Sequence, residues 1–265
     1  MSLPPSPEPP PPAFLVSALR AAGCVFAEDE ARVLHASARD HAELTSMVER
    51  RAAGLPLEHV VGWAEFCGLR IAVDPGVFVP RRRTEFLARQ ALARTRPGAT
   101  VVDLCCGTGA VAAVLAARAP GRLHAADLDP AAVACARRNL APLGGEVHEG
   151  DLYDPLPAEL AGCVDILIAN GPYVPTGDLP LLPSEARDHE RQIALDGGKD
   201  GLDVLRRVAE RAPRWLAPGG RLFVETSERQ ADTALAAVRA AGLGARLVED
   251  DDLYATVVVG TRPAH

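Results

Sequence analysis

The sequence predicts an α/β fold built around a mostly parallel, doubly wound sheet. Three observations lead to this prediction. Segments of strand and helix character alternate from residue 84 onward, the strand segments are apolar runs typical of buried strands, and two strands joined by a short loop close the chain. Apolar residues make up 48% of the 265 residues, which is enough to bury a full core and excludes global disorder.

The first quarter of the chain has a different character. Residues 1–12 form a proline-rich tail that we expect to be loose, with a proline-motif ligand for a partner domain as the alternative. Between residues 13 and 62, apolar residues recur at three- and four-residue intervals, which predicts a small helical domain ended by Gly54 and Pro56. A domain of about 50 residues is small for independent stability, so we expect it to lean on the rest of the chain.

Residues 63–80 predict a short β-hairpin that links two domains. Apolar residues alternate there among turn signals at Gly68 and Asp74-Pro75-Gly76. Residues 81–265 then predict one large α/β domain. Its seven strands are expected at residues 99–104, 122–128, 145–150, 164–170, 221–226, 245–250 and 255–260. Its helices are expected at residues 84–95, 108–119, 130–140, 201–216 and 228–241.

Three local signals refine this plan. Pro130 suits the first turn of a helix, and Pro218-Gly219-Gly220 is typical of a helix end. The short loop between the last two strands predicts an antiparallel hairpin at one edge of the sheet. The stretch 171–200 predicts a long proline-rich loop, and within it Asp188-His189-Glu190 indicates a solvated lid, because adjacent residues seldom point at one metal ion.

The charge balance disfavours nucleic acid as the main partner. Lys and Arg number 28 against 35 Asp and Glu, a net charge of −7, whereas proteins that bind through phosphate contacts are usually basic. The one sharp basic spot is Arg81-Arg82-Arg83. Ribosomal RNA or an acidic protein face could dock there, and a merely solvated arginine run explains it equally well.

The cysteines predict a reducing compartment and no metal site. They lie at positions 24, 67, 105, 106, 135 and 163, without a CxxC pair or zinc-ligand spacing. No apolar run reaches the length of about 18 residues expected of a membrane helix, and the N-terminus lacks the pattern of a signal peptide. We therefore expect a cytoplasmic protein with no membrane partner.

A cofactor site is expected where the first strands of the sheet end. Ligands of such sheets bind at the carboxyl ends of the strands. The first strand ends at Asp103, and Gly107 and Gly109 allow a sharp turn and a close approach to a ligand. The second strand ends at Asp127, with Asp129 two residues on. Their spacing from the glycines suits an adenosine-type cofactor, whose ribose hydroxyls would donate hydrogen bonds to a carboxylate.

Two cofactors compete for this site. Gly107-x-Gly109-x-x-Ala112 is a passable nicotinamide fingerprint, but Asp103 before it would repel a pyrophosphate. An acidic strand end suits a ligand with a positive charge, and S-adenosyl-L-methionine carries one. A tight turn without any ligand is the third interpretation. Asp151, after the third strand, could accept from an adenine amino group or simply cap a turn.

The fourth strand ends in Asn170-Gly171-Pro172-Tyr173, and this run resembles the motif of N-P-P-Y methyltransferases, which methylate planar nitrogens. The likeness extends over residues 15–262 and indicates the HemK/PrmC family of N5-glutamine methyltransferases. The blocks that carry it are Gly54–Gly62, Glu65–Leu69, Val73–Val77, Val79–Arg81, Ala194–Leu202 and Pro218–Gly220.

The resemblance implies a class I, Rossmann-like methyltransferase whose substrate is the Gly-Gly-Gln loop of a peptide-chain release factor and whose product is S-adenosyl-L-homocysteine. The helical domain at residues 13–62 would recognise that protein. The residues implied for the donor are Asp103, Cys105, Cys106, Gly107, Thr108, Gly109, Asp127, Asp151, Leu152 and Asn170. Asn170, Gly171, Pro172 and Tyr173 would hold the substrate amide, with the Asn170 oxygen and the Gly171 carbonyl accepting its two hydrogens.

Three residues or runs depart from the family pattern. Gly171 replaces the first proline of the motif, Cys105 replaces the first glycine of the donor loop, and Arg81-Arg82-Arg83 replaces an Arg-Pro-x block before Thr84 and Glu85. We expect the backbone at Cys105 to avoid positive φ. The alternatives are an enzyme that methylates adenine or cytosine amines in RNA or DNA, a donor-binding paralogue without turnover, and a nicotinamide oxidoreductase.

Overall fold

The computed structural model describes residues 12–264, and the chain divides into two compact units, Met1–Gly62 and Trp63–His265. The predicted proline-rich tail therefore lies outside the described residues except for Pro12. In the described part of the chain, no helix is long and apolar enough to cross a membrane.

The first unit consists of four helices in its described part. They are α1 (Ala13–Ala21), α2 (Ala27–Ser37), α3 (His41–Ala52) and α4 (Leu57–Val61). Their apolar faces meet in one core that includes Leu15, Leu34 and Met47. Asp40 begins α3 by accepting a hydrogen bond from the backbone N–H of Glu43 at 2.8 Å, as expected of an N-cap residue.

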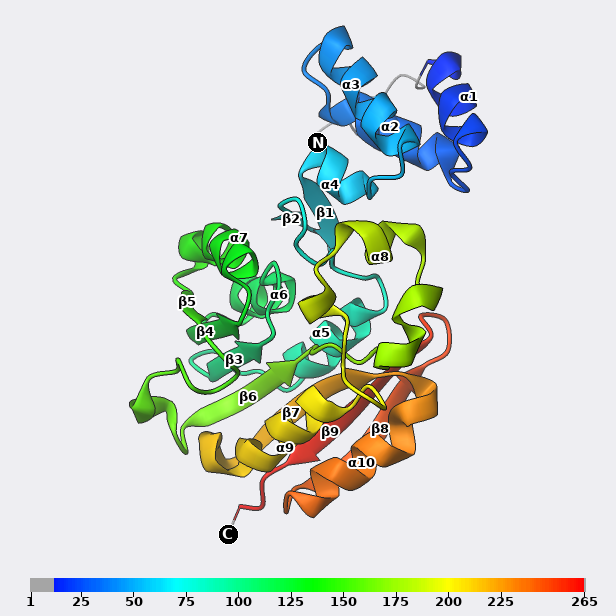
Figure 1. Cartoon of the computed structure of the whole chain (residues 1–265). Helices are drawn as coiled ribbons and strands as arrows, with labels where there is room; N and C mark the ends of the chain where they lie inside the picture. Colours follow the sequence, from blue (N-terminus) through cyan, green and yellow to red (C-terminus); the bar gives the residue numbers. More distant parts are fainter. Residues whose placement is uncertain (1–11, 265) are drawn as a thin grey trace. The chain divides into compact units, whose positions relative to one another are not determined.

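The second unit is built on a seven-stranded sheet with the order β5-β4-β3-β6-β7-β9-β8 (Figure 1). The strands are β3 (Thr100–Leu104), β4 (Arg122–Asp127), β5 (Glu146–Glu149), β6 (Val164–Ala169), β7 (Leu216–Thr226), β8 (Gly244–Asp250) and β9 (Ala255–Thr261). The first five run parallel, and β9 pairs antiparallel with both β7 and β8. The predicted α/β fold with its antiparallel edge hairpin is confirmed.

Helices cover both faces of this sheet. One core packs α5 (Thr84–Leu92), α6 (Ala110–Arg118) and α7 (Pro130–Leu140) against one face, and a second core packs α9 (Asp203–Trp215) and α10 (Ala231–Ala240) against the other. Short 3-10 turns complete the unit at Ala141–Leu143, Ala158–Leu160 and Glu228–Gln230. The α7 helix begins at Pro130, as predicted, and Asp129 caps it by accepting from the Ala131 N–H at 2.9 Å.

A two-stranded antiparallel hairpin, β1 (Trp63–Phe66) and β2 (Leu69–Ala72), begins the second unit. Asn139 of α7 fixes its end, because the backbone N–H of Ala72 donates to the Asn139 oxygen and the Asn139 amide donates to the Ala72 carbonyl, both at 2.9 Å. The hairpin is thus bound to the unit that contains the sheet.

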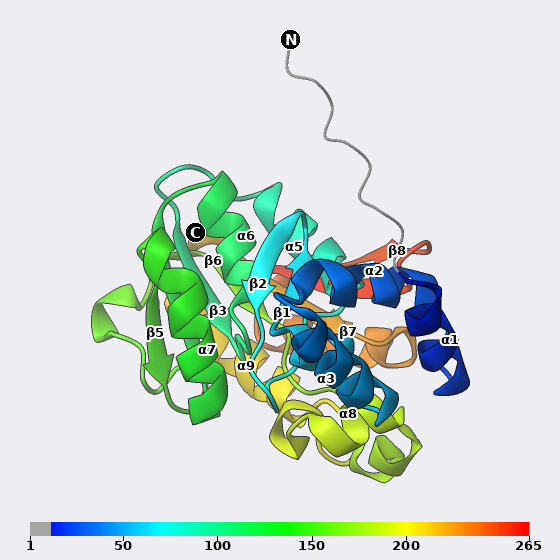
Figure 2. The same cartoon turned by 90° about the horizontal axis from the view of Figure 1, so that it is seen from above.

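Two segments differ from the sequence prediction. The stretch 171–200 contains three short helical elements, at Thr176–Leu181, Ser184–His189 (α8) and Gln192–Ala194, which gather in one group (Figure 2). Pro218-Gly219-Gly220 lies inside β7, which follows α9 directly. The helix ends at Trp215, close to the predicted residue 216, but the strand begins earlier than the predicted residue 221. A Cβ on Gly220 would lie 2.6 Å from the Val164 carbonyl oxygen, so this glycine serves the close approach of two strands.

Candidate active site

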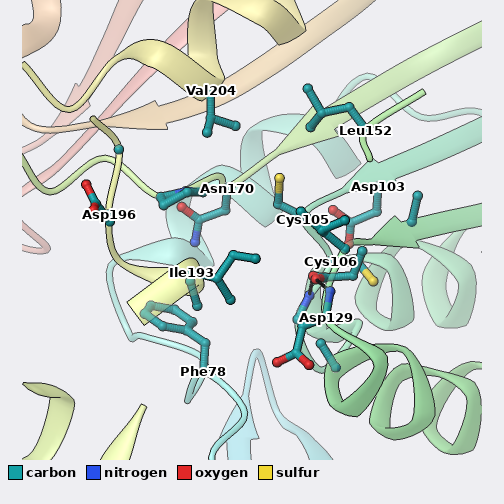
Figure 3. Close-up of a pocket in the computed structure, with 18 of the residues that line it drawn as sticks. Phe78, Asp103, Cys105, Cys106, Asp129, Leu152, Asn170, Ile193, Asp196 and Val204 are labelled. Carbon is teal, nitrogen blue, oxygen red and sulfur yellow. Dashed lines mark hydrogen bonds between the residues drawn. The ribbon is translucent and has the colours of Figure 1, made fainter. Parts of the chain in front are cut away.

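The main pocket of the second unit opens where β3, β4, β5 and β6 end, and its volume is about 650 Å³ (Figure 3). The view shows Cys105 between Asp103 and Asn170, with Val204 on one side and Phe78 and Ile193 on the other. Ten of the predicted site residues line it: Asp103, Cys105, Cys106, Gly107, Thr108, Asp127, Asp151, Leu152, Asn170 and Pro172. A pocket of this size accommodates a ligand as large as a nucleoside derivative.

The loop after β3 forces the backbone into the left-handed region three times. Gly107 and Gly109 have φ of 54° and 75°, and Cys105 has φ of 54°. The expectation that Cys105 avoids positive φ is therefore wrong. The turn requires this conformation whichever residue occupies it, which explains why a glycine suits the position, and Cys105 adopts it at a cost of about 1–2 kcal/mol.

Gly109 does not line the pocket. It precedes α6, and a Cβ there would lie 3.0 Å from Leu140 Cδ1 and 3.4 Å from Ala136 Cβ. The glycine thus lets α6 approach α7 closely, and this packing sets the direction in which the loop presents Gly107 and Thr108 to the pocket.

Asp127 connects the end of β4 to the loop after β3. Its carboxylate accepts from the Gly107 N–H at 2.8 Å and from the Asp129 N–H at 2.9 Å. Burial raises its pKa, and these backbone hydrogen bonds oppose the rise. Each carboxylate oxygen has a second lone pair, so Asp127 can still accept the two hydroxyls of a ribose.

Asp103 is the most deeply buried acid of the pocket, with 2% of its surface exposed. Burial raises the pKa of its carboxyl to about 7, a hydrogen bond from the Ala112 N–H (3.2 Å) lowers it, and the nearby Asp127 raises it further. A cationic group entering the pocket would therefore be paired with a carboxylate that has little other compensation.

Asp151 and Leu152 form another part of the wall. Arg207 of α9 donates to Asp151 at 2.5 Å, and Leu152 is buried with φ of 50°. Arg207 also lines the pocket and was missed by the sequence analysis. Nothing in the sequence marks it, because 56 residues separate it from its partner.

Asn170 is oriented by a network that reaches it from two other elements. Its amide nitrogen donates to the Thr84 hydroxyl at 3.3 Å, and Thr84 lies beside the buried carboxylate of Glu225 on β7, whose pKa it lowers. Tyr173 Oη and Arg83 Nε also donate to Glu225 Oε1, each at 3.3 Å. Because the Asn170 nitrogen is engaged, its oxygen remains to accept a hydrogen bond from a substrate.

A second hollow of about 290 Å³ adjoins the first, and the Asn170–Tyr173 run separates the two. Asn170 and Pro172 line both hollows, whereas Gly171 and Tyr173 line only the second. Phe78 is also shared. The arrangement suits a donor on one side of the run and an acceptor on the other.

The two departures from the family pattern at Cys105 and Gly171 are neighbours in space. A Cβ built on Gly171 would lie 3.5 Å from Cys105 Sγ and 3.0 Å from Val204 Cγ1. A side chain at position 171 would thus crowd both residues. Cys105 and Val204 lie beside the glycine and fill space that a proline ring at position 171 would need.

Two arginines of the basic run form ion pairs with buried glutamates, and one of these glutamates belongs to the segment predicted to be a lid. Arg81 donates to Glu190 at 2.6 Å, the Val79 N–H donates to the same carboxylate at 3.0 Å, and the Glu190 side chain is fully buried. The prediction of a solvated lid is therefore wrong at Glu190. Because Arg83 pairs with Glu225, two of the three arginines have an acidic partner, which weakens the case for a nucleic-acid patch.

A profile of the family described as the methyltransferase small domain matches residues 68–179. The chain is 41% identical over 192 residues to a release factor glutamine methyltransferase of Geobacter sulfurreducens. The matched region covers 71% of this chain and 66% of the relative. It is 38% identical over 251 residues to the enzyme of that name from Cereibacter sphaeroides, and the matched region covers 86% of this chain and 88% of that relative.

The chain spans just under two thirds of the Geobacter relative, and one other relative carries a different name. A 4-amino-L-phenylalanine/4-methylamino-L-phenylalanine methyltransferase of Streptomyces pristinaespiralis is 41% identical over 203 residues, covering 74% of this chain and 69% of the relative. Among solved structures, a methyltransferase from Pyrococcus furiosus has the same fold, with a TM-score of 0.57, 15% identity, and coverage of 84% of this chain and all of that one.

Proposed function

Because the chain belongs to the family of release factor glutamine methyltransferases, we propose that it transfers a methyl group from S-adenosyl-L-methionine to the side-chain amide nitrogen of a glutamine. The proposed substrate is the Gly-Gly-Gln loop of a peptide-chain release factor. The observation that carries the proposal is Asn170, whose amide nitrogen is held by Thr84 so that its oxygen is left for the acceptor side.

The residues of the first hollow fit the donor. Asp103 offers a buried carboxylate to the positive amino group, and Asp127 retains lone pairs for the ribose hydroxyls. Asp151 and Leu152 would flank the adenine, and Gly107, whose Cβ position has no neighbour within 4 Å, permits a close approach of the backbone. When bound, the donor supplies an activated methyl group on its sulfonium.

The chain's own contribution is orientation. An amide nitrogen is a poor nucleophile because its lone pair is delocalised into the carbonyl. The Asn170 oxygen and the Gly171 carbonyl would accept its two hydrogens, fixing the amide plane and directing its face toward the methyl group. Neither hollow is lined by a histidine or lysine in the described part of the chain, which agrees with a transfer that needs no strong base before the methyl moves.

The release factor and the compartment are inferred from the family. The helical unit would help to grip the protein substrate, and an enzyme acting on the translation machinery would work in the cytoplasm. The acidic total charge and the paired arginines Arg81 and Arg83 support a protein substrate over a nucleic acid.

The test is methyl transfer to the host's release factor. The purified chain is incubated with S-adenosyl-L-methionine and the factor, and the Gly-Gly-Gln peptide is mapped by mass spectrometry. We expect one added methyl group on the glutamine, lost with Asn170→Ala and retained with Asp232→Ala, an exposed change on α10. An unmodified peptide despite measured donor binding would refute the substrate and leave the donor site standing.

One relative supports a second acceptor class. The Streptomyces pristinaespiralis protein is named for methylating an aromatic amine, and the second hollow here is lined by Phe78 and Tyr173, which suit a flat ring. If the release factor stays unmodified, 4-amino-L-phenylalanine and then RNA are the next acceptors to assay. Nucleobase transfer would show a steep loss of binding with salt, whereas transfer to a small aromatic amine would not.

A further inference from the structure

A cluster of metal-ligating side chains lies outside both hollows, on strands β4 and β5. His124 of β4 pairs in register with Glu146 of the edge strand β5, and His148 follows two residues later on the same face. One ligand atom from each residue lies within 4.8 Å of the other two. None of the three lines the donor or acceptor hollow.

The two imidazoles are placed as ligands of one ion would be. His124 Nδ1 and His148 Nε2 are 3.2 Å apart, and the rings stack at 20° with their centroids 5.5 Å apart. Two nitrogens on one tetrahedral zinc ion, each about 2.0–2.1 Å from it, are about 3.3–3.4 Å apart. A shared proton would satisfy the same two atoms, so the distance fits both arrangements.

The third residue favours a cation over a shared proton. Glu146 Oε2 lies 3.9 Å from His124 Nδ1, and its side chain is 67% exposed, so it can turn toward the pair at little cost. Two neutral imidazoles that share a hydrogen bond carry no net charge, so a carboxylate beside them balances nothing. A bound cation carries a positive charge that the carboxylate would balance. Two histidines and one glutamate also form a known set of zinc ligands that leaves a position open for water.

Charged groups of both signs surround the two rings. Burial disfavours the charged form of each imidazole and so lowers the pKa of both histidines. The charged groups facing His124 are Glu146 and Glu159, which favour a cation, and Arg122, which opposes it. Glu146 and Arg137 act on His148 in the same opposed way.

We propose that His124, Glu146 and His148 bind a divalent transition metal ion of the zinc type that cross-links β4 to the edge strand β5. Imidazole nitrogens with one carboxylate suit such an ion better than magnesium or calcium, which prefer oxygen ligands. The ion would hold together two strands whose carboxyl ends lead into Asp127 and Asp151. The site lies outside both hollows, so the proposal does not depend on the proposed methyl transfer.

The experiment uses Co²⁺ and Zn²⁺ with the full chain. Isothermal titration gives stoichiometry and affinity, and the absorption spectrum of the Co²⁺ form distinguishes nitrogen and oxygen ligands from thiolates. We expect one equivalent bound at pH 7.5, a spectrum without a thiolate band, and a rise in the melting temperature on adding metal.

The variants avoid the buried His124, whose replacement could unfold the sheet. His148→Gln should weaken binding at least about tenfold and abolish the metal-dependent rise in melting temperature, and Glu146→Gln should weaken binding less. Cys163→Ser, an exposed change, should leave binding unaltered. Equal affinity in His148→Gln and the parent chain, or a thiolate band in the cobalt spectrum, would overturn the proposal.

Discussion

Position 171 shows how two unusual residues can depend on each other. Gly171 has Val204 Cγ1 at 3.0 Å and Cys105 Sγ at 3.5 Å from where its Cβ would be. Taken singly, the glycine at position 171 and the cysteine at position 105 would each be interpreted as the loss of a functional residue of the family. In space, the bulk of Cys105 and Val204 lies where a residue larger than glycine would need room, so the site is repacked and not simply degraded.

We therefore expect Gly171→Pro to lower stability and turnover, because the added ring overpacks a filled space, at a typical cost of about 1–3 kcal/mol. Adding Val204→Ala should recover part of that loss. Urea unfolding and methyl-transfer rates of the single and double variants, with Val204→Ala alone as the control, measure the coupling. Strictly additive effects would contradict a shared packing site.

Thr84 is expected to act as a positioning residue through Asn170. Thr84→Val removes the acceptor of the Asn170 amide hydrogen bond, at a typical cost of about 0.5–1.5 kcal/mol. The turnover number should fall up to about tenfold, whereas the dissociation constant of the donor should change little. Thr84→Ser should restore turnover. A loss confined to donor binding would argue against this role.

At the residue scale, the sequence singled out the loop after β3 and the Asn170 run because each is a contiguous motif, and residues of both line the pocket. It missed Thr84, Glu225 and Arg207 as site residues, since their partners lie 52 to 86 positions away along the chain. A sequence motif identifies site residues that lie in one loop. Site residues that are distant in the sequence can be recognised only when the order of the strands in the sheet is known.

Elements were predicted where the signal is local. The α7 helix begins at Pro130 because the Asp129 cap and the proline act on the same turn. At Pro218-Gly219-Gly220 the helix end was predicted well, but the start of β7 was predicted too late, for the converse reason. The local preference of this run is a turn, but the carbonyl of Val164 on β6 requires a residue without a side chain at position 220, and that requirement comes from another strand.

The helices of the first unit share a buried ion pair. Arg51 of α3 donates to Glu30 of α2 at 2.6 Å and 3.1 Å, and their side chains are 9% and 12% exposed. Arg51→Met should destabilise this unit by about 3–5 kcal/mol, because it leaves a buried carboxylate without its partner. The loss of helical circular dichroism on heating the full chain measures it.

The double variant Glu30→Leu with Arg51→Met is the control for that change. Replacing both charges by apolar side chains removes the uncompensated group, so the double variant should be closer to the parent chain than Arg51→Met is. If the single variant melts like the parent, the pair contributes little to the unit.

The contribution of Asp103 to the stability of the whole molecule should fall as pH rises from about 4 to 7. Its pKa rises from 3.8 in the unfolded chain to about 7 in the folded one, so over this range the folded state holds a proton that the unfolded state has released. The contribution to the free energy of unfolding falls by at most about 1.4 kcal/mol per pH unit.

Urea unfolding of the parent chain and of Asp103→Asn at several pH values isolates that slope. The difference between the two should be largest near pH 7, where the parent has lost the contribution, and smallest near pH 4. A constant difference across the range would mean that Asp103 ionises in the folded protein as it does in water.

The order of strands in the sheet is the part of the whole molecule that the sequence did not predict. The alternation of strands and helices indicated a parallel sheet, and the short loop at residues 251–254 indicated the β8–β9 hairpin. Neither shows that β9 pairs with β7. That pairing depends on which strand of the hairpin meets the edge of the sheet, and it is β9, whose residues are mostly buried, and not the more polar β8.

Strand β9 lies between β7 and β8, although it follows both of them in the chain. A ribosome makes the protein from its N-terminus, so β7 and β8 leave the exit tunnel before the strand that joins them exists. Until residues 255–261 emerge, β7 has one bare edge and β8 has no partner in the sheet. The nascent chain thus completes its sheet in one late step, and a ribosome stalled before that step exposes an edge to which other chains can add.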